Sequence, residues 1–191
     1  MLFTPLDLPG AYIIDVEPHH DERGFFARTW CSDDFAARGL SSTIAQSSIS
    51  FNERKGTLRG MHYQAAPHEE IKIVRCTAGA IVDVIVDLRA TSPTFAKWVA
   101  VELTAANRRL LYIPEGLAHG FQTLCDATEI FYQISTGYEP GAARGIRWDD
   151  PAFAIRWPDP HTPIMSERDR SYPDFHLRDG SGPDLPRTSE T

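Results

Sequence analysis

The sequence predicts a mostly β fold, an antiparallel sandwich or jelly-roll barrel with a few short helices. Strand-like runs of about five to eight residues, rich in β-branched and aromatic side chains, recur with turn signals every 8–12 residues or so. Strands do not alternate with helices, and neither a GxGxxG motif nor a P-loop occurs, which argues against a doubly wound parallel sheet.

The elements are expected in the following order. Residues 1–17 are expected to form two short extended pieces, broken at Pro5 and at Pro9-Gly10, the second with strand composition over 12–16. Further predicted strands cover residues 25–30, 43–51, 56–64, 71–78, 80–88, 97–103, 110–113, 119–124 and 129–135. Ser32-Asp33-Asp34 should cap a short helix over 34–38 that ends at Gly39, and residues 18–24 read as a turn with a solvated His19-His20 pair.

Past Tyr138 the composition changes to loop-forming residues. A loop rich in glycine and arginine is expected over 139–150, and a short polar turn or helix start over 166–170. The chain is therefore interpreted as a single jelly-roll domain over residues 1–176, followed by a flexible tail over 177–191 without apolar periodicity.

Composition excludes several classes of function. With 191 residues, 42% apolar and 24% charged, the chain is typical of one soluble globular domain. A net charge of −7 argues against a general nucleic-acid or anionic-membrane binder. Its 3 cysteines are far apart and fit neither a disulfide framework nor a zinc site, which favours a reducing cytoplasm. Neither a transmembrane run nor a signal peptide is predicted.

The stretch from Gly56 to Gln64 holds the strongest candidate for chemistry. It places His62 in an alternating segment, and Lys72 follows ten residues later in another alternating run. Neutral histidine is a good general base at cellular pH, and a nearby cation suits proton abstraction next to a carbonyl. In a regular strand Arg59 would point away from His62, unless a bulge or kink at Gly60 changes the alternation.

The stretch Pro114 to His119 has the pattern PxGxxH, which is typical of small jelly-roll barrels in which the histidine enters the barrel mouth. In metal-binding cupins such a histidine is one ligand among several. Here the earlier HxH pattern is missing, because His62 is followed by Tyr63-Gln64. A metal set of His62, Glu70 and His119 stays open as an alternative.

Together these and other stretches resemble the dTDP-4-dehydrorhamnose 3,5-epimerases, nucleotide-sugar epimerases with a cupin fold. The resemblance runs from about residue 15 to residue 174, and a set of so many segments in order is highly specific. The matching stretches are 21–26, 56–64, 82–89, 92–95, 112–121, 145–151 and 166–169.

The resemblance implies a catalytic set of four residues. His62 matches the general base that takes the proton next to the C4 ketone, and Asp169 matches the carboxylate that pairs with it. Lys72 matches the cation that stabilises the enolate oxygen, and Tyr132 matches the acid that returns a proton on the opposite face. No metal and no other cofactor is implied.

It further implies a nucleotide-sugar substrate of the dTDP-linked type, no nucleic-acid or membrane partner, and a homodimer. The implied substrate contacts are Arg23, Phe26, Gln46, Arg59, His119 and Tyr138. The N-terminal strands of this family cross to the second subunit, so Arg23 and Phe26 are expected to act on the neighbour's site. Arginine suits a diphosphate because its planar fork bonds two oxygens at once.

Three departures from the family pattern leave the exact sugar and nucleotide open. Ser47-Ser48 stands where many members have Asp-Asn, Arg28 replaces a glutamate, and Glu70 replaces a glutamine. The leading hypothesis is a cofactor-independent epimerase that inverts C3, C5 or both. The alternatives are a metal-dependent cupin oxygenase or isomerase, and a sugar-binding cupin without turnover.

Overall fold

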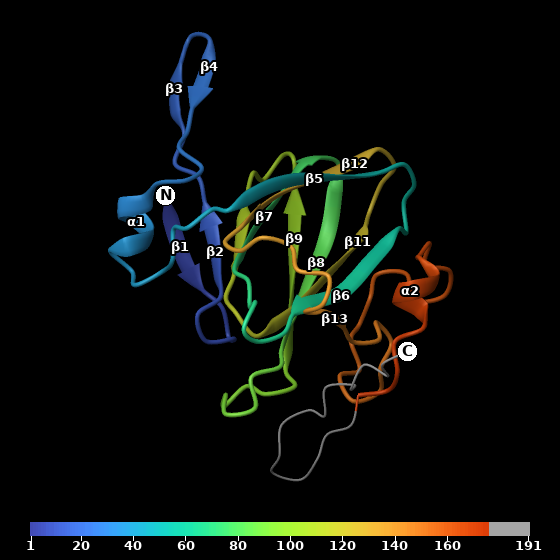
Figure 1. Ribbon diagram of the computed structural model, residues 1–191. Helices are drawn as coiled ribbons and strands as arrows, with labels where there is room; N and C mark the ends of the chain where they lie inside the picture. Colours follow the sequence, from blue (N-terminus) through green and yellow to red (C-terminus); the bar gives the residue numbers. More distant parts are fainter. Residues whose placement is uncertain (176–191) are drawn as a thin grey trace.

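Two antiparallel sheets face each other and form a jelly-roll barrel in the computed structural model, which describes residues 1–175 (Figure 1). The six-stranded sheet contains, in spatial order, β1 (Leu2–Pro5), β2 (Tyr12–Asp15), β10 (Leu110–Ile113), β7 (Lys72–Ala78), β12 (Thr128–Ile134) and β5 (Gln46–Asn52). The five-stranded sheet contains β13 (Ala143–Gly145), β6 (Leu58–Gln64), β11 (Leu117–Thr123), β8 (Ala80–Asp87) and β9 (Trp98–Thr104). The predicted mostly β class is confirmed.

The core between the sheets is built from the inward side of each alternating strand. Ile81 and Ile85 of β8 meet Val74 of β7 and Ile130 of β12, and all four are fully buried. Each such side chain contributes about 1.5–3 kcal/mol through removal of apolar surface from water. These apolar side chains fill the space between the two sheets at this part of the barrel.

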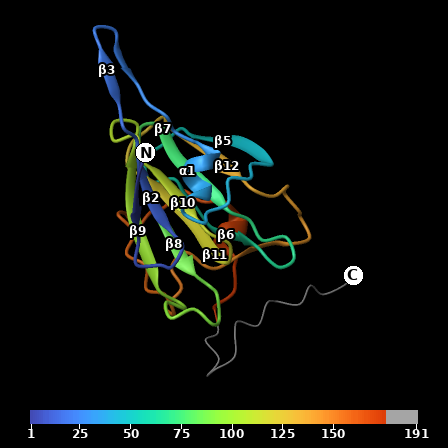
Figure 2. The same cartoon turned by 90° about the vertical axis from the view of Figure 1, so that its left-hand side faces the viewer.

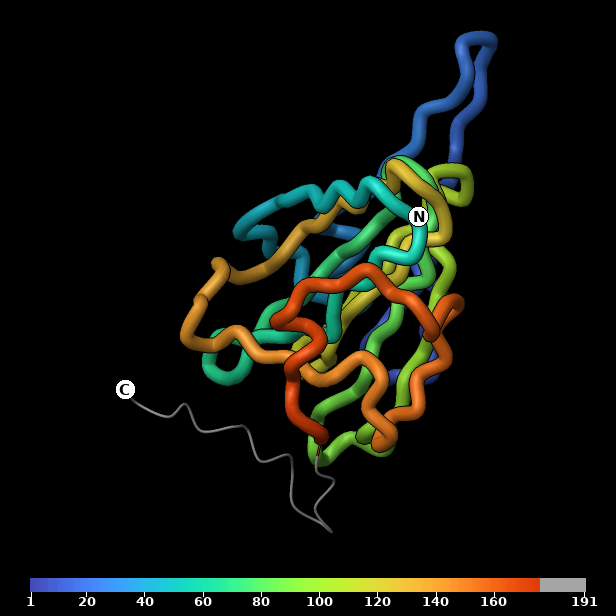
Figure 3. The backbone as a smooth tube through the Cα atoms, turned by 90° about the vertical axis from the view of Figure 1, so that its right-hand side faces the viewer, coloured from blue at the N-terminus to red at the C-terminus, as the bar shows by residue number. Residues whose placement is uncertain are grey.

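The outer face of each sheet is covered by a different part of the chain. Phe35 of helix α1 (Ser32–Ala36) packs on the six-stranded sheet, where α1 lies over the strands in Figure 2. Phe153 and Trp157 of the long C-terminal segment pack on the five-stranded sheet, and Figure 3 shows this orange and red segment crossing that side of the barrel. Neither described helix has the length and apolar character needed to traverse a bilayer.

A two-stranded hairpin, β3 (His19–Asp21) and β4 (Gly24–Phe26), projects away from the barrel (Figures 1 and 2). This corrects two predictions: the expected turn over 18–24 contains a strand, and the expected strand over 25–30 ends at Phe26. All six strand residues are exposed, so no inward-facing row existed to mark the hairpin in the sequence.

The other differences are small. Helix α1 begins at Ser32 rather than Asp34, and its N-cap is Cys31, which makes no side-chain capping bond. Strand β13 was predicted as loop, because Ala-Arg-Gly has little strand propensity and forms a strand only by pairing with β6. The remaining strands lie within a few residues of their predicted ranges, and helix α2 (Glu167–Arg170) begins where the polar turn was expected. The predicted tail over 177–191 lies outside the described residues.

The end of β8 is held by a buried carboxylate. Asp87 accepts hydrogen bonds from the Arg89 guanidinium at 2.7 Å, from Ser92 Oγ at 2.6 Å and from Thr94 Oγ1 at 2.7 Å. Burial alone would raise the pKa of Asp87, but these donors outweigh it and lower the pKa to about 2. The turn that joins β8 to β9 is therefore fixed by an ionised side chain.

Replacing Asp87 by asparagine is expected to lower the free energy of unfolding at pH 7 by roughly 2 kcal/mol, the equivalent of its pKa shift. Because the folded-state pKa lies below the unfolded one, the carboxylate stabilises the fold fully above about pH 4 and loses that contribution as the pH falls through about 2. Urea unfolding at pH 7, 4 and 2.5 tests this. A difference between wild type and Asp87→Asn that does not shrink toward low pH would contradict it.

Candidate active site

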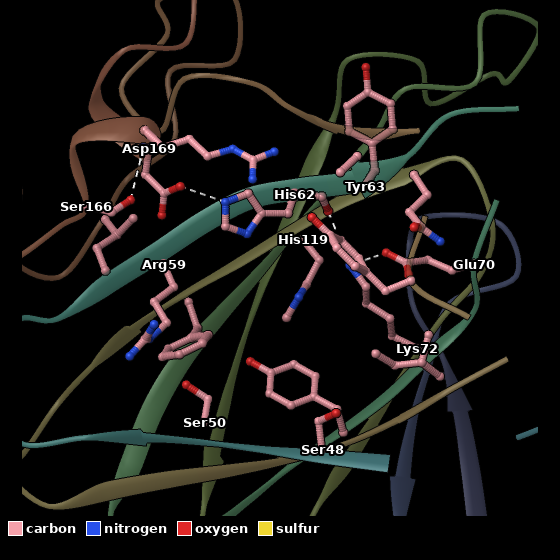
Figure 4. A pocket seen from close by; sticks show the side chains of 18 of the residues that line it. Ser48, Ser50, Arg59, His62, Tyr63, Glu70, Lys72, His119, Ser166 and Asp169 are labelled. Carbon is pink, nitrogen blue, oxygen red and sulfur yellow. Dashed lines mark hydrogen bonds and ion pairs between the residues drawn. The ribbon is translucent and has the colours of Figure 1, made fainter. Parts of the chain in front are cut away.

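One open end of the barrel holds a cavity of about 580 Å³ between the two sheets (Figure 4). His62, His119 and Arg59 reach it from the five-stranded sheet, and Lys72 and Tyr132 reach it from the six-stranded sheet. Asp169, on α2, lies at its edge. The four predicted catalytic residues are thus brought to one cavity, although the first and the last of them, His62 and Asp169, are 107 positions apart in the sequence.

The two histidines are set by strand register. His62 on β6 lies directly opposite His119 on β11, so both side chains share the cavity face. A register shift follows between His119 and Phe121, and Gly60 adopts a φ of +138° beside it. A Cβ at Gly60 would lie 2.5 Å from the Gly120 Cα atom, so only glycine fits there.

The same irregularity explains the position of Arg59. In a regular strand Arg59 and His62, three residues apart, would face opposite sides, yet both line the cavity. Arg59 Nε donates to Asn52 Oδ1 on β5 at 2.7 Å, which ties its guanidinium to the facing sheet. The backbone irregularity at Gly60, which the sequence left as one possibility, thus accompanies a cation at the cavity wall.

His62 and Asp169 form a hydrogen-bonded pair at 2.7 Å between Nε2 and Oδ1. The second carboxylate oxygen of Asp169 accepts from the Gly60 backbone N–H at 3.2 Å. Ser166 caps α2, because its Oγ atom accepts a hydrogen bond from the Asp169 backbone N–H at 3.1 Å. The backbone and the carboxylate of Asp169 are therefore both held in place. Figure 4 shows His62 projecting into the cavity from this anchor.

The charge of Asp169 decides which nitrogen of His62 can act. Burial opposes its ionisation, but the bonds from His62 and Gly60 prevail and hold the pKa of Asp169 below its ordinary value. An ionised carboxylate only accepts hydrogen bonds, so Nε2 of a neutral His62 carries the proton. Nδ1 then keeps a free lone pair, as a general base requires.

Lys72 faces the cavity as one half of an ion pair. Its Nζ atom lies 2.8 Å from Glu70 Oε1, and both side chains are only 10% exposed. Nζ also donates to the His62 carbonyl oxygen at 3.4 Å. The cation predicted to stabilise an enolate is therefore adjacent to the strand that carries the base.

Tyr132 sits on β12 in the sheet opposite His62. Burial raises the pKa of its phenol, and the nearby charge of Asp83 raises it further, whereas Arg59 opposes this. The hydroxyl therefore holds its proton at neutral pH. A protonated donor on the wall that faces a general base is the arrangement that inversion at a carbon requires.

A second histidine–carboxylate pair was missed in the sequence. His119 Nε2 lies 2.9 Å from Asp83 Oδ2, and both side chains are buried. Burial raises the pKa of Asp83, while the facing His119 and Lys72 oppose the rise. Asp83 could have been noticed as a charge between Ile81 and Ile85 in an inward row, but its partner lies 36 residues away.

The predicted substrate contacts divide into two groups. Gln46, Arg59, His119 and Tyr138 line the cavity, together with Ser48 and Arg168, which the sequence did not single out as contacts. Arg23 and Phe26 lie on the projecting hairpin and are not brought to this chain's own cavity. Arg23 is paired there with Asp21.

The alternative metal set is not assembled. His62 is bonded to Asp169, Glu70 to Lys72 and His119 to Asp83. Among residues 1–175, no group of three or more histidine, cysteine or acidic side chains is arranged to hold a metal ion. Each side chain of the alternative metal set is thus hydrogen-bonded or ion-paired with a residue outside that set.

Comparison with known proteins decides the family. The family model described as dTDP-4-dehydrorhamnose 3,5-epimerase matches residues 5–176. This chain belongs to that family. The enzyme of that name from Sinorhizobium fredii is 39% identical over 173 residues, which cover 91% of this chain and 89% of the relative.

Solved structures agree with the assignment. The dTDP-4-dehydrorhamnose 3,5-epimerase from Elizabethkingia anophelis superposes with a TM-score of 0.89 at 34% identity, covering 91% of this chain and 96% of that one. A 3′-monoepimerase from Streptomyces bikiniensis in complex with dTDP-quinovose gives 0.82 at 34% identity, covering 89% and 86%. The predicted fold, a cupin-like jelly roll, and the predicted class, a nucleotide-sugar epimerase, are confirmed.

Proposed function

We propose that this family member inverts both C3 and C5 of a dTDP-linked 4-keto-6-deoxyhexose, with His62 as base and Tyr132 as acid. The observation that carries this is their placement: His62 and Tyr132 line one cavity from opposite sheets. Inversion requires that a proton leave one face of a carbon and return to the other. Two groups on facing walls meet this requirement without a cofactor.

In the proposed step Nδ1 of His62 takes the proton from the carbon next to the ketone. The C–H electron pair becomes the enolate double bond, and the carbonyl oxygen receives the negative charge. Lys72, which lines the cavity, stabilises this oxygen by charge and by an N–H donor. Tyr132 then protonates the opposite face, and its phenolate and the His62 imidazolium return to their starting states by proton exchange with water.

Binding of the substrate is assigned to the remaining polar lining. Arg59 and His119 supply donors for the sugar and diphosphate, and Gln46 and Tyr138 extend the wall toward the cavity mouth. The dTDP-quinovose held by the Streptomyces bikiniensis enzyme supports a dTDP-linked ligand. Of the two positions where Asp-Asn is more common, only Ser48 lines the cavity, so the β5 wall carries a smaller polar side chain there.

We further propose a homodimer in which the hairpin of one subunit enters the other's cavity. Phe26 is 75% exposed on the projecting hairpin, and Ile49 is 64% exposed on β5, the edge strand of its sheet. Unpaired edges with apolar side chains are suited to association. A dimer would bring Arg23 and Phe26 to the partner's substrate, and the three free cysteines fit the reducing cytoplasm expected from the sequence.

The test is hydrogen exchange with solvent. Incubated in D2O with a dTDP-4-keto-6-deoxyhexose, the enzyme is expected to place deuterium at both C3 and C5, as read by NMR. Label at one carbon only would replace the proposal by a monoepimerase, the activity named for the similar Streptomyces bikiniensis protein. No label at either carbon, with several nucleotides tried, would leave a sugar-binding protein without turnover.

A further inference from the structure

Glu70 is a nearly buried carboxylate in the cavity that the proposed proton transfers do not use. It lines the same wall as Lys72 and pairs with it at 2.8 Å, each side chain being 10% exposed (Figure 4). Two charges held out of water require a close partner, so neither group is a solvated surface residue.

The hydrogen bonds of Lys72 can be counted one by one. An ammonium group has three N–H donors. Glu70 Oε1 accepts the first at 2.8 Å, and the His62 carbonyl oxygen accepts a longer second bond at 3.4 Å. The third N–H has no acceptor among the described residues, and because Lys72 lines the cavity this donor is available to a bound ligand.

We propose that Glu70 is a positioning residue for Lys72: it fixes the ammonium group so that the free N–H is aimed at the oxygen that becomes negative. This rests on the proposed function, in which Lys72 stabilises the enolate. Lysine has a long, flexible stem, and its ammonium group is a point charge without a planar fork to orient it. A short bond to a second, nearly buried side chain supplies the missing orientation.

The carboxylate also compensates charge in the resting enzyme. With Glu70 ionised, the pair is neutral when the cavity holds no negative oxygen, so Lys72 is retained there at a lower desolvation cost. When the enolate forms, the third N–H gains a charged acceptor while the first stays on Glu70. The ammonium group then stabilises the transition state without having to move.

Two substitutions separate orientation from charge. Glu70→Ala removes the acceptor, and Glu70→Gln keeps an oxygen acceptor but removes the charge. For Glu70→Ala we expect kcat for deuterium incorporation to fall about 10–100-fold, the scale of a catalytic group displaced by an ångström or less, with KM within about 3-fold of wild type. Glu70→Gln is expected to stay within about 5-fold of wild type in both constants.

The matched control is Glu69→Ala, because Glu69 is the adjacent acidic residue and does not line the catalytic cavity. It should leave kcat and KM unchanged, and thermal melting of every variant confirms folding. A further pair of variants, Lys72→Met and the double variant Glu70→Ala/Lys72→Met, tests whether Glu70 acts through Lys72. If Glu70 acts through Lys72, the double variant is no slower than Lys72→Met alone over a long incubation.

Several results would overturn the assignment. An unchanged kcat for Glu70→Ala would show that Glu70 does not position Lys72. A rise in KM alone would make Glu70 a substrate contact. Equal losses for Glu70→Ala and Glu70→Gln would show that the charge of Glu70, and not the orientation it gives, is decisive. Failure of the proposed function is separately visible, because wild type itself would then incorporate no deuterium.

Discussion

Replacing His62 by alanine is expected to abolish deuterium incorporation at both C3 and C5, with a loss on the order of 10³-fold or more. Two histidines that are paired with carboxylates line the cavity, and the His62 side chain is 41% exposed there, whereas that of His119 is 5% exposed, so His62 is the more accessible base. Loss at one carbon alone would mean that two different bases serve the two positions. NMR of the 4-keto sugar in D2O measures both carbons in one sample.

The control for this change is His68→Ala. His68 follows the same strand, carries the same chemical group and does not line the cavity, so the variant should exchange at the wild-type rate. Substrate binding by His62→Ala, measured by calorimetry with dTDP, should also persist, because Arg59 and His119 are untouched. A His62→Ala enzyme that binds and still exchanges within about tenfold of wild type would remove His62 from the role of base.

Replacing Tyr132 by phenylalanine is expected to separate abstraction from inversion. Without the phenol, His62 still takes the proton, but the enolate is reprotonated mainly from the His62 face. Deuterium therefore enters with retained configuration, at a rate we expect within about tenfold of wild type, while inverted product falls about 100-fold. One NMR time course measures both processes: deuterium in the sugar of unchanged configuration reports proton abstraction, and the signals of the new isomer report inversion.

Tyr12→Phe provides the matched control, because Tyr12 packs on the outer face of the six-stranded sheet, away from the cavity. Its exchange and inversion should both match wild type. If Tyr132→Phe loses the two activities in equal proportion, the phenol is needed for abstraction as well, and its assignment as the acid of the far face is wrong. The pH dependence adds a check: since the pKa of Tyr132 is raised, its loss of a proton cannot limit activity near neutrality.

Where a strand has at least one buried face, its sequence was sufficient to locate it. Ile81, Val84 and Ile85 mark β8 because alternate positions meet different layers. The hairpin β3–β4 buries nothing in this chain, and β13 exists only because β6 offers it partners. The local sequence preference of these residues cannot predict either element, since β13 depends on pairing with β6 and the hairpin has no buried face in this chain.

His62 and Lys72 were singled out from the strand pattern, and Asp169 and Tyr132 were added by the resemblance, but the arrangement of these four predicted residues was not foreseen. The face of Arg59 depended on the irregularity at Gly60, which the sequence offered only as one possibility. Asp83 escaped because its significance comes from His119 on another strand, and Glu70 was read first as a possible metal ligand. Pairs separated by many residues become visible only when the topology brings their strands together.

The position of Asp169 has a consequence for the chain as it is made. The carboxylate that orients His62 belongs to one of the last described segments, yet it bonds to Gly60 and His62 near the middle of the barrel. During synthesis, the barrel strands leave the ribosome well before this residue does. A chain that terminates early would thus carry every strand and a histidine without its anchor. We expect a chain that stops before Asp169 to fold its strands but to lack the hydrogen bonds that orient His62, and therefore to be inactive.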